Sequence, residues 1–199
     1  MSARRALSGM ALLMITAACQ PTGEPGAKLP EASENDLADA RAAAGQLGGE
    51  LKAQLVAAMQ AEGPIGGVRV CAEVADDIAA GVSGETGLEV GRTSLRVRNA
   101  SNAPDDWETE GLNYFSEAIA DGTPREELSY FTVVERGDEP VLRWMSPIMM
   151  GEVCQTCHGT DVSDEVKAVI AEYYPNDLAT GFRAGELRGA FTVEKVIAD

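Results

Sequence analysis

Two cysteines and a histidine late in the chain carry the clearest chemical signal. Cys154 and Cys157 are three positions apart and His158 follows directly, within the run CQTCHG. At this spacing both vinyl groups of a haem can be captured as thioethers while the imidazole reaches the iron. We therefore expect one covalent haem c, attached through Cys154 and Cys157, with its iron bound by His158.

The same spacing of cysteines also occurs in zinc knuckles and in redox-active dithiols. A tetrahedral zinc site would need two ligands besides Cys154 and Cys157, and apart from carboxylates the chain offers only His158, Cys71 and Cys19. A thioredoxin-like dithiol is expected near a strand-helix-strand pattern, and none surrounds these cysteines. Haem attachment is therefore the preferred interpretation.

The sixth position of a haem iron needs a ligand or stays open, and several residues are candidates. Cys71 lies at the edge of an apolar pattern over residues 65–80 and can serve as a thiolate ligand. It can equally be a small buried hydrophobic residue, as most free cysteines are. Met145, Met149 and Met150 are rival ligands, so the residues alone leave this position open.

The N-terminus has the pattern of an export signal. Residues 1–18 begin with the basic pair Arg4 and Arg5 and continue into an apolar run that is too short to span a bilayer. Cys19 follows two alanines, where lipoprotein processing would leave a lipidated cysteine, although Thr16 stands where leucine is usual. We expect a location on the periplasmic side with a lipid anchor to the outer membrane through Cys19, ordinary cleavage being the alternative.

The charge balance limits the partners. The chain has 16 basic and 32 acidic residues, a net charge of −16. Nucleic acid and anionic lipid headgroups are poor partners for such a surface. A basic redox or signalling protein would suit it, and so would a purely solubilising role, which is the preferred interpretation.

Segment patterns predict an α+β domain over residues 35–199, behind a flexible Pro- and Gly-rich tether over residues 19–34. Apolar residues at three- and four-residue spacing predict a helix of about 25 residues from Leu37 to Met59, ended by Gly63-Pro64. The other predicted elements are a second helical pattern over 65–80, a strand over 88–98, a helix over 107–119, strands over 128–135 and 141–148, a helix starting at Ser163 and a strand over 187–196.

The strand over residues 88–98 carries three arginines. Alternating strand residues point to opposite faces, so Arg92, Arg96 and Arg98 could share one face. A guanidinium fork matches a carboxylate. These arginines are therefore candidates to bind the haem propionates, while surface acids are their alternative partners.

Several of these segments together resemble a single-haem c-type family first described as a domain of unknown function, which has a cyanobacterial member with a PAS-like fold. They are VGRTSLRVRN at residues 90–99, NAPDDWE at residues 102–108, the upstream Cys71 and the late CQTCHG. The resemblance spans roughly residues 37–196. It implies a PAS-like antiparallel sheet with flanking helices and a long N-terminal helix, with His158 and Cys71 on opposite sides of the iron. Ala100 departs from the family pattern, where proline is expected.

A thiolate ligand stabilises ferric iron, so we expect a low reduction potential. Loss of that ligand on reduction would open a site for a small gas or shift the helix that carries it. We therefore expect a redox or small-gas sensor that acts through a protein partner, with a low-potential periplasmic electron carrier as the alternative. An enzyme is not expected, because the chain has no second histidine for acid-base work.

Overall fold

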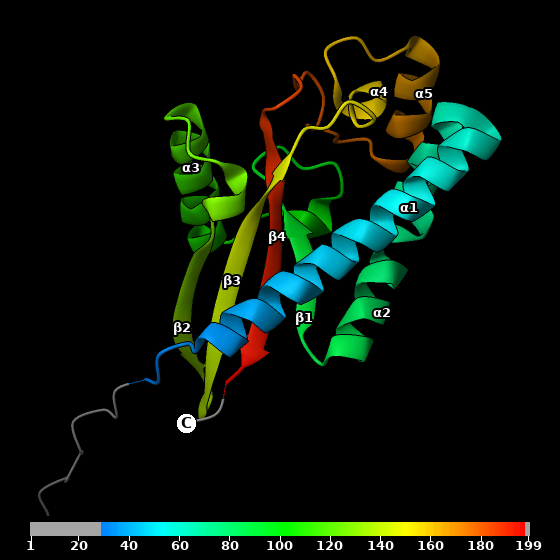
Figure 1. Ribbon diagram of the computed structural model, residues 1–199. Coiled ribbons are helices and arrows are strands. Elements are labelled where there is room, and N and C mark those ends of the chain that lie inside the picture. Colours follow the sequence, from blue (N-terminus) through cyan, green and yellow to red (C-terminus); the bar gives the residue numbers. More distant parts are fainter. Residues whose placement is uncertain (1–28, 198–199) are drawn as a thin grey trace, which may run out of the picture.

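The computed structural model describes residues 29–197 of the 199-residue chain (Figure 1). The predicted signal segment 1–18 and Cys19 lie outside the described residues. The helices and strands are, in chain order, α1 (Glu34–Glu73), α2 (Ala75–Thr86), β1 (Glu89–Thr93), η1 (Ala100–Asn102), α3 (Asp106–Ala120), η2 (Arg125–Glu127), β2 (Tyr130–Arg136), β3 (Glu139–Met149), α4 (Gln155–His158), α5 (Asp164–Tyr173) and β4 (Leu187–Val196).

The long N-terminal helix α1 begins at a capping box and bends in its second half. The Ser33 side chain accepts from the backbone of Asp36, and the Asp36 carboxylate accepts from the backbone of Ser33. Gly63-Pro64 was expected to end this helix. Instead Gly63 turns the chain at a φ of 70°, a conformation that suits glycine. Pro64 then starts a second helical segment, where its missing N–H costs little.

The pattern over residues 65–80 is divided between two helices, which corrects the prediction of one. The second segment of α1 ends at Glu73, and α2 begins at Ala75. Val74 between them has a non-helical φ of −121°. The apolar spacing continues across this junction, so the sequence pattern could not reveal the break.

Four antiparallel strands form an open sheet in the order β1-β4-β3-β2 (Figure 1). Strands β2 and β3 are joined by a tight turn in which Gly137 has a φ of 65°, a conformation that suits glycine. The α+β class expected from the sequence, a PAS-like antiparallel sheet with flanking helices and a long N-terminal helix, is confirmed.

Strand β1 is shorter than predicted, because it ends at Thr93 rather than near residue 98. The cause is Ser94, whose hydroxyl accepts from the backbone of Arg96 at 3.1 Å and so closes a local turn. Arg96 and Arg98 therefore lie in the loop after the strand. The alternation rule does not place them on one face with Arg92.

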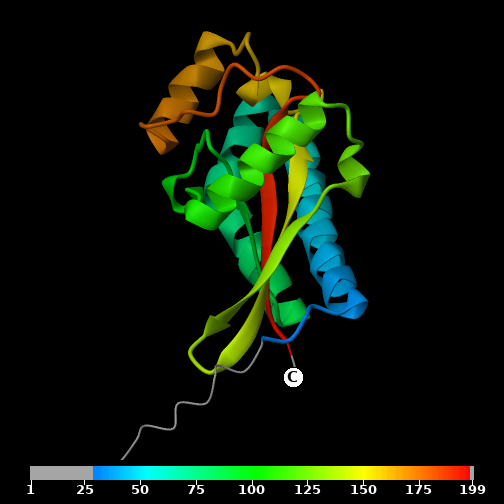
Figure 2. The ribbon, with the colours of Figure 1, turned by 90° about the vertical axis from the view of Figure 1, so that its left-hand side faces the viewer.

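Helices cover both faces of the sheet (Figures 1 and 2). The core between α1, α2 and the sheet contains Leu47 and Trp144, and the core under α3 contains Phe115 and Met145. Trp144 and Met145 are consecutive in β3, so they point to opposite faces. Each helical layer thus packs on its own set of alternating side chains.

The Cys-x-x-Cys-His motif follows shortly after β3, at the end of the sheet where α1 bends. Its residues form the single turn α4, and Ser163 caps the N-terminus of α5. The second segment of α1 contributes Val68 to a small core with Val166 and Ile170 of α5. Within residues 29–197 no helix is long and apolar enough to cross a membrane.

Candidate functional site

A cavity of about 660 Å³ lies between α1 and the ends of β1, β3 and β4. This volume falls within the range of small-molecule and cofactor sites, roughly 300 to 1,000 Å³. Cys71, Cys154, Cys157 and His158 all line it. The structure thus brings into one cavity the three motif residues and a cysteine more than 80 positions away in the sequence.

His158 is oriented by a backbone carbonyl. Its Nδ1 lies 2.7 Å from the carbonyl oxygen of Ala179. Because a carbonyl can only accept, Nδ1 carries the proton and Nε2 keeps its lone pair. Burial, together with the positive charges of Arg188 and Arg98, lowers the pKa of His158 to about 2. The imidazole is therefore neutral and ready to bind a metal ion through Nε2.

The turn that carries the motif is held by backbone contacts with residues 179–182. The Phe182 amide donates to the His158 carbonyl at 3.0 Å, and the Gly181 amide donates to the Gly159 carbonyl at 2.8 Å. At Gly159 a Cβ atom would lie only 2.5 Å from the carbonyl oxygen of Gln155. A glycine after the histidine is therefore a steric requirement of this turn.

Cys71 approaches the cavity from the second segment of α1. Burial raises the pKa of its thiol, while Arg92 and Arg98 act in the opposite direction. Binding of a metal ion would displace the thiol proton. Tyr174, just after α5, donates its hydroxyl to the Cys71 carbonyl at 2.9 Å. Burial raises the pKa of Tyr174 to about 12, so this hydroxyl is a donor at neutral pH.

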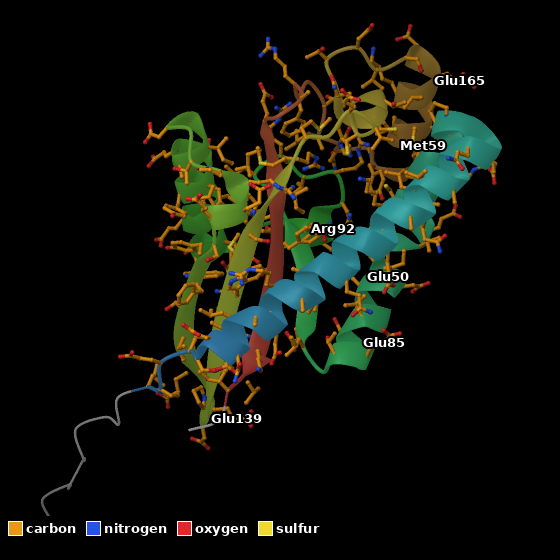
Figure 3. The ribbon with its side chains drawn as sticks, in the orientation of Figure 1. Glu50, Met59, Glu85, Arg92, Glu139 and Glu165 are labelled. Carbon is orange, nitrogen blue, oxygen red and sulfur yellow. The ribbon has the colours of Figure 1, made fainter. Side chains whose placement is uncertain are left out.

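The first segment of α1 forms a mostly apolar wall of the cavity, in which Lys52 is the charged residue. Gly45 and Gly49 line it, and a Cβ atom at either position would meet nothing within 4 Å. Leu55 and Met59 continue this wall toward the bend, and Figure 3 shows Met59 on α1 near α5. Such a wall suits a flat apolar ligand, because no side chain projects from the glycine positions.

The three predicted arginines have different surroundings. Arg92 lines the cavity and lies between the sheet and α1 in Figure 3. Arg98 also lines the cavity, but it forms an ion pair with Asp177 at 3.0 Å and donates to the Cys157 carbonyl at 2.6 Å. Arg96 is not among the residues that line the cavity, and its guanidinium lies 4.0 Å above the ring of Phe182.

Sequence reasoning missed Arg188, a fourth arginine at the cavity. Its Nη1 donates to the Ser94 hydroxyl at 3.0 Å, while its buried Nε has no hydrogen-bond partner within the part of the chain that the structure describes. Burial and the neighbouring Arg98 and Arg92 lower its pKa to about 10. The sequence holds no signal for this placement, because it depends on an irregularity in β4.

The candidate methionine ligands lie on different faces of the sheet. Met149 and Met150 line the cavity, whereas Met145 is fully buried under α3 on the other face of the sheet. Met59 lines the cavity too, although it was not considered from the sequence. Met59 is far from the motif in the sequence, so its position at the cavity was not predicted.

The residues present fit a haem. A pair of thiols and a neutral imidazole face the cavity, the glycine positions leave room for a flat group, and the cationic side chain of Arg188 lines the cavity wall. Across residues 29–197 no three His, Cys, Asp or Glu side chains are grouped as a metal site of their own. A haem needs at most two iron ligands from the chain, because the porphyrin itself supplies four nitrogen ligands.

Fold and site define an α+β protein whose open antiparallel sheet and bent N-terminal helix enclose a cavity bearing a Cys-x-x-Cys-His motif. The profile of the Tll0287-like family matches residues 16–195, and the chain belongs to that family. The solved structure of the cyanobacterial heme-protein Tll0287 matches with a TM-score of 0.61 and 21% identity, over 84% of this chain and 99% of that one. No curated protein matches the chain.

Proposed function

We propose that this protein carries one covalent haem c and acts as a redox or small-gas sensor. Cys154 and Cys157 would form the thioethers, and His158, through Nε2, and Cys71 would bind the iron. The observation that carries the proposal is that Cys71 lines the same cavity as the attachment motif. The fold shared with a protein described as a heme-protein supports it.

A haem in this cavity would supply an iron that changes its charge by one electron and can exchange its sixth ligand. The chain supplies the surroundings that set the direction of these changes. A thiolate from Cys71 favours the ferric state, which gives the low potential expected from the sequence. The buried, neutral His158 remains fixed through its bond to Ala179.

The position of Cys71 favours a sensor over an electron carrier. Cys71 lies on the segment Pro64–Glu73, beyond the bend at Gly63. This segment packs on α5, and the Tyr174 hydroxyl, just after α5, donates to its backbone at the Cys71 carbonyl. Release of Cys71 would therefore change the restraints on a helical segment that begins at the bend of Gly63 and packs on a neighbouring helix.

The proposed role involves no catalytic turnover. His158 is the only histidine of the chain, and its Nδ1 is occupied by the Ala179 carbonyl. Among the described residues, no Asp or Glu lines the cavity. The part of the site that the structure describes thus offers no carboxylate for the acid-base work of a haem enzyme.

The location we propose is the periplasmic side of the membrane, reached through the signal at residues 1–18. Haem is attached to this type of motif after export, so the signal and the motif support each other. A lipid on Cys19 would hold the protein at the outer membrane. Its acidic surface would then meet a basic redox or signalling partner.

Backbone hydrogen exchange in the ferric and ferrous holoprotein tests the sensor role. We expect the amides of residues 65–73 to exchange faster after reduction, because loss of Cys71 frees the segment beyond Gly63. The Cys71→Ser holoprotein should show no such difference between its two redox states. Equal exchange in both states of the wild type would instead favour the electron carrier.

A further inference from the structure

We propose that Arg188 and Arg92 bind the two propionate carboxylates of the haem, in place of the arginine set that the sequence suggested. This inference rests on the proposed function. The inference adds a specific anion-binding site inside the cavity to that function.

An irregularity in β4 turns Arg188 into the cavity. Ile148 pairs with Gly189, but Met149 pairs with Leu187, so Arg188 is an extra residue on its strand. The neighbouring side chains of β4 confirm that the alternation between the two faces of the sheet shifts by one residue here. Leu187 and Ala190 both pack under α3 although they are three positions apart, which a regular strand would not allow. A bulge of this kind re-aims a side chain.

Arg188 is held in place while part of its guanidinium lacks an acceptor. Nη1 donates to the Ser94 hydroxyl at 3.0 Å and to the Arg96 carbonyl at 3.3 Å. The Ser94 hydroxyl in turn donates to the Arg188 carbonyl at 2.8 Å. The buried Nε has no partner among the described residues. A buried cation is costly, and a carboxylate bound in the cavity would compensate its charge.

Arg92 provides the second cation from the neighbouring strand. It pairs in register with Phe191 of β4, three positions beyond Arg188, and lines the same cavity. Within residues 29–197 it has no hydrogen bond or ion pair, and no acidic side chain lines the cavity. The chain has a net charge of −16, yet this part of the cavity is lined by the cations Arg92 and Arg188, which favours an anionic ligand.

The other basic residues near the cavity are exposed or already occupied. Arg125 and Lys52 line the cavity but are exposed, and Arg125 pairs with Glu126 at 2.9 Å. Arg98 donates to both carboxylate oxygens of Asp177 and to the carbonyls of Cys157 and Ala179, so its side chain braces the loop behind His158. Arg96 stacks on Phe182 and donates to the Leu178 carbonyl. Neither has the combination of cavity exposure and free donors that Arg188 and Arg92 share.

The test compares holoproteins with Arg188→Met, Arg92→Met and Arg96→Met substitutions. The wild type is first checked for covalent haem, because its absence would overturn the proposed function itself. Midpoint potential and the propionate bands in resonance Raman spectra are then measured. We expect Arg188→Met and Arg92→Met each to favour the ferric form by about tenfold, or about 59 mV for one electron, and to shift the propionate bands.

Arg96→Met is the control, expected to change the equilibrium by less than about twofold and to leave the bands in place, because Arg96 lies outside the cavity wall. Wild-type potentials and bands in both test variants, in protein that does carry haem, would overturn this inference alone. If Arg188→Met does not fold, Arg188→Lys replaces it. Loss of the guanidinium fork should then shift the bands, whereas Arg96→Lys should not, and unchanged bands in Arg188→Lys would count against the site.

Discussion

His158 and Cys71 share a cavity, but the chain restrains them in different ways. His158 sits on a turn fixed by backbone bonds and by Arg98, which joins the Cys157 carbonyl to the buried Asp177. Cys71 is restrained mainly through its own helix and the Tyr174 hydroxyl. The two candidate iron ligands thus differ in how easily each could leave, and the rigid one is the histidine.

Replacing Asp177 by Asn tests the brace behind His158. The Arg98 and Asp177 side chains are 8% and 10% exposed, so the change leaves a buried cation without its partner. We expect the free energy of unfolding in urea to fall by about 3 kcal/mol. Glu62→Gln breaks the exposed pair with Arg69 and should cost less than about 1 kcal/mol. Similar losses in the two variants would contradict this account of the brace.

The sequence identified the residues whose chemistry is local and missed those placed by tertiary structure. Cys154, Cys157 and His158 lie within five positions, so their spacing alone predicted a shared role. The separation of Arg96 from Arg92 follows from a turn closed by Ser94. The position of Arg188 follows from a bulge in β4, and no periodicity in the sequence records either event.

At the scale of elements, the bend in α1 organises the site. The first segment of α1 supplies the mostly apolar wall with Gly45 and Gly49, and the second segment brings Cys71 to the cavity. The spacing of apolar residues and the helix start at Ser163 made most elements predictable. The continuation of α1 past Pro64 was not predicted, because the positive φ of Gly63 turns the chain without ending the helix.

Tyr174→Phe removes the hydrogen bond from α5 to the segment that carries Cys71. We expect a loss of about 1 kcal/mol in unfolding free energy and a several-fold faster binding of added imidazole to the ferric holoprotein, because Cys71 is released more often. Tyr173→Phe is the matched control, since its hydroxyl bonds the exposed Glu73 carboxylate rather than the Cys71 backbone. Equal imidazole binding rates in the two variants would show that Tyr174 does not restrain the ligand.

For the molecule as a whole, surface and cavity carry opposite charge. The chain has a net charge of −16, yet the charged residues that line the cavity are all basic, among them Lys52, Arg92 and Arg188. Composition revealed only the first fact, because the grouping of the basic residues depends on how strands β1 and β4 meet. An anionic group is therefore expected inside the cavity and a basic partner outside it.

Deletion of residues 2–18 tests the proposed export. In a bacterial host that matures c-type haem outside the cytoplasm, the complete chain should acquire covalent haem. The shortened chain should not, because it would stay on the wrong side of the membrane. Pyridine haemochrome spectra of the purified proteins distinguish the two, and covalent haem on the shortened chain would contradict export through this segment.

The most direct test of the account is the electron paramagnetic resonance spectrum of the ferric holoprotein beside that of Cys71→Ser. With covalent haem verified by mass in both, the wild type should give a low-spin signal of thiolate character, and the variant should lose it. Such a pair of spectra would establish His158 and Cys71 as the two axial ligands. An unchanged spectrum in Cys71→Ser would contradict the account and return Cys71 to the role of a buried apolar residue.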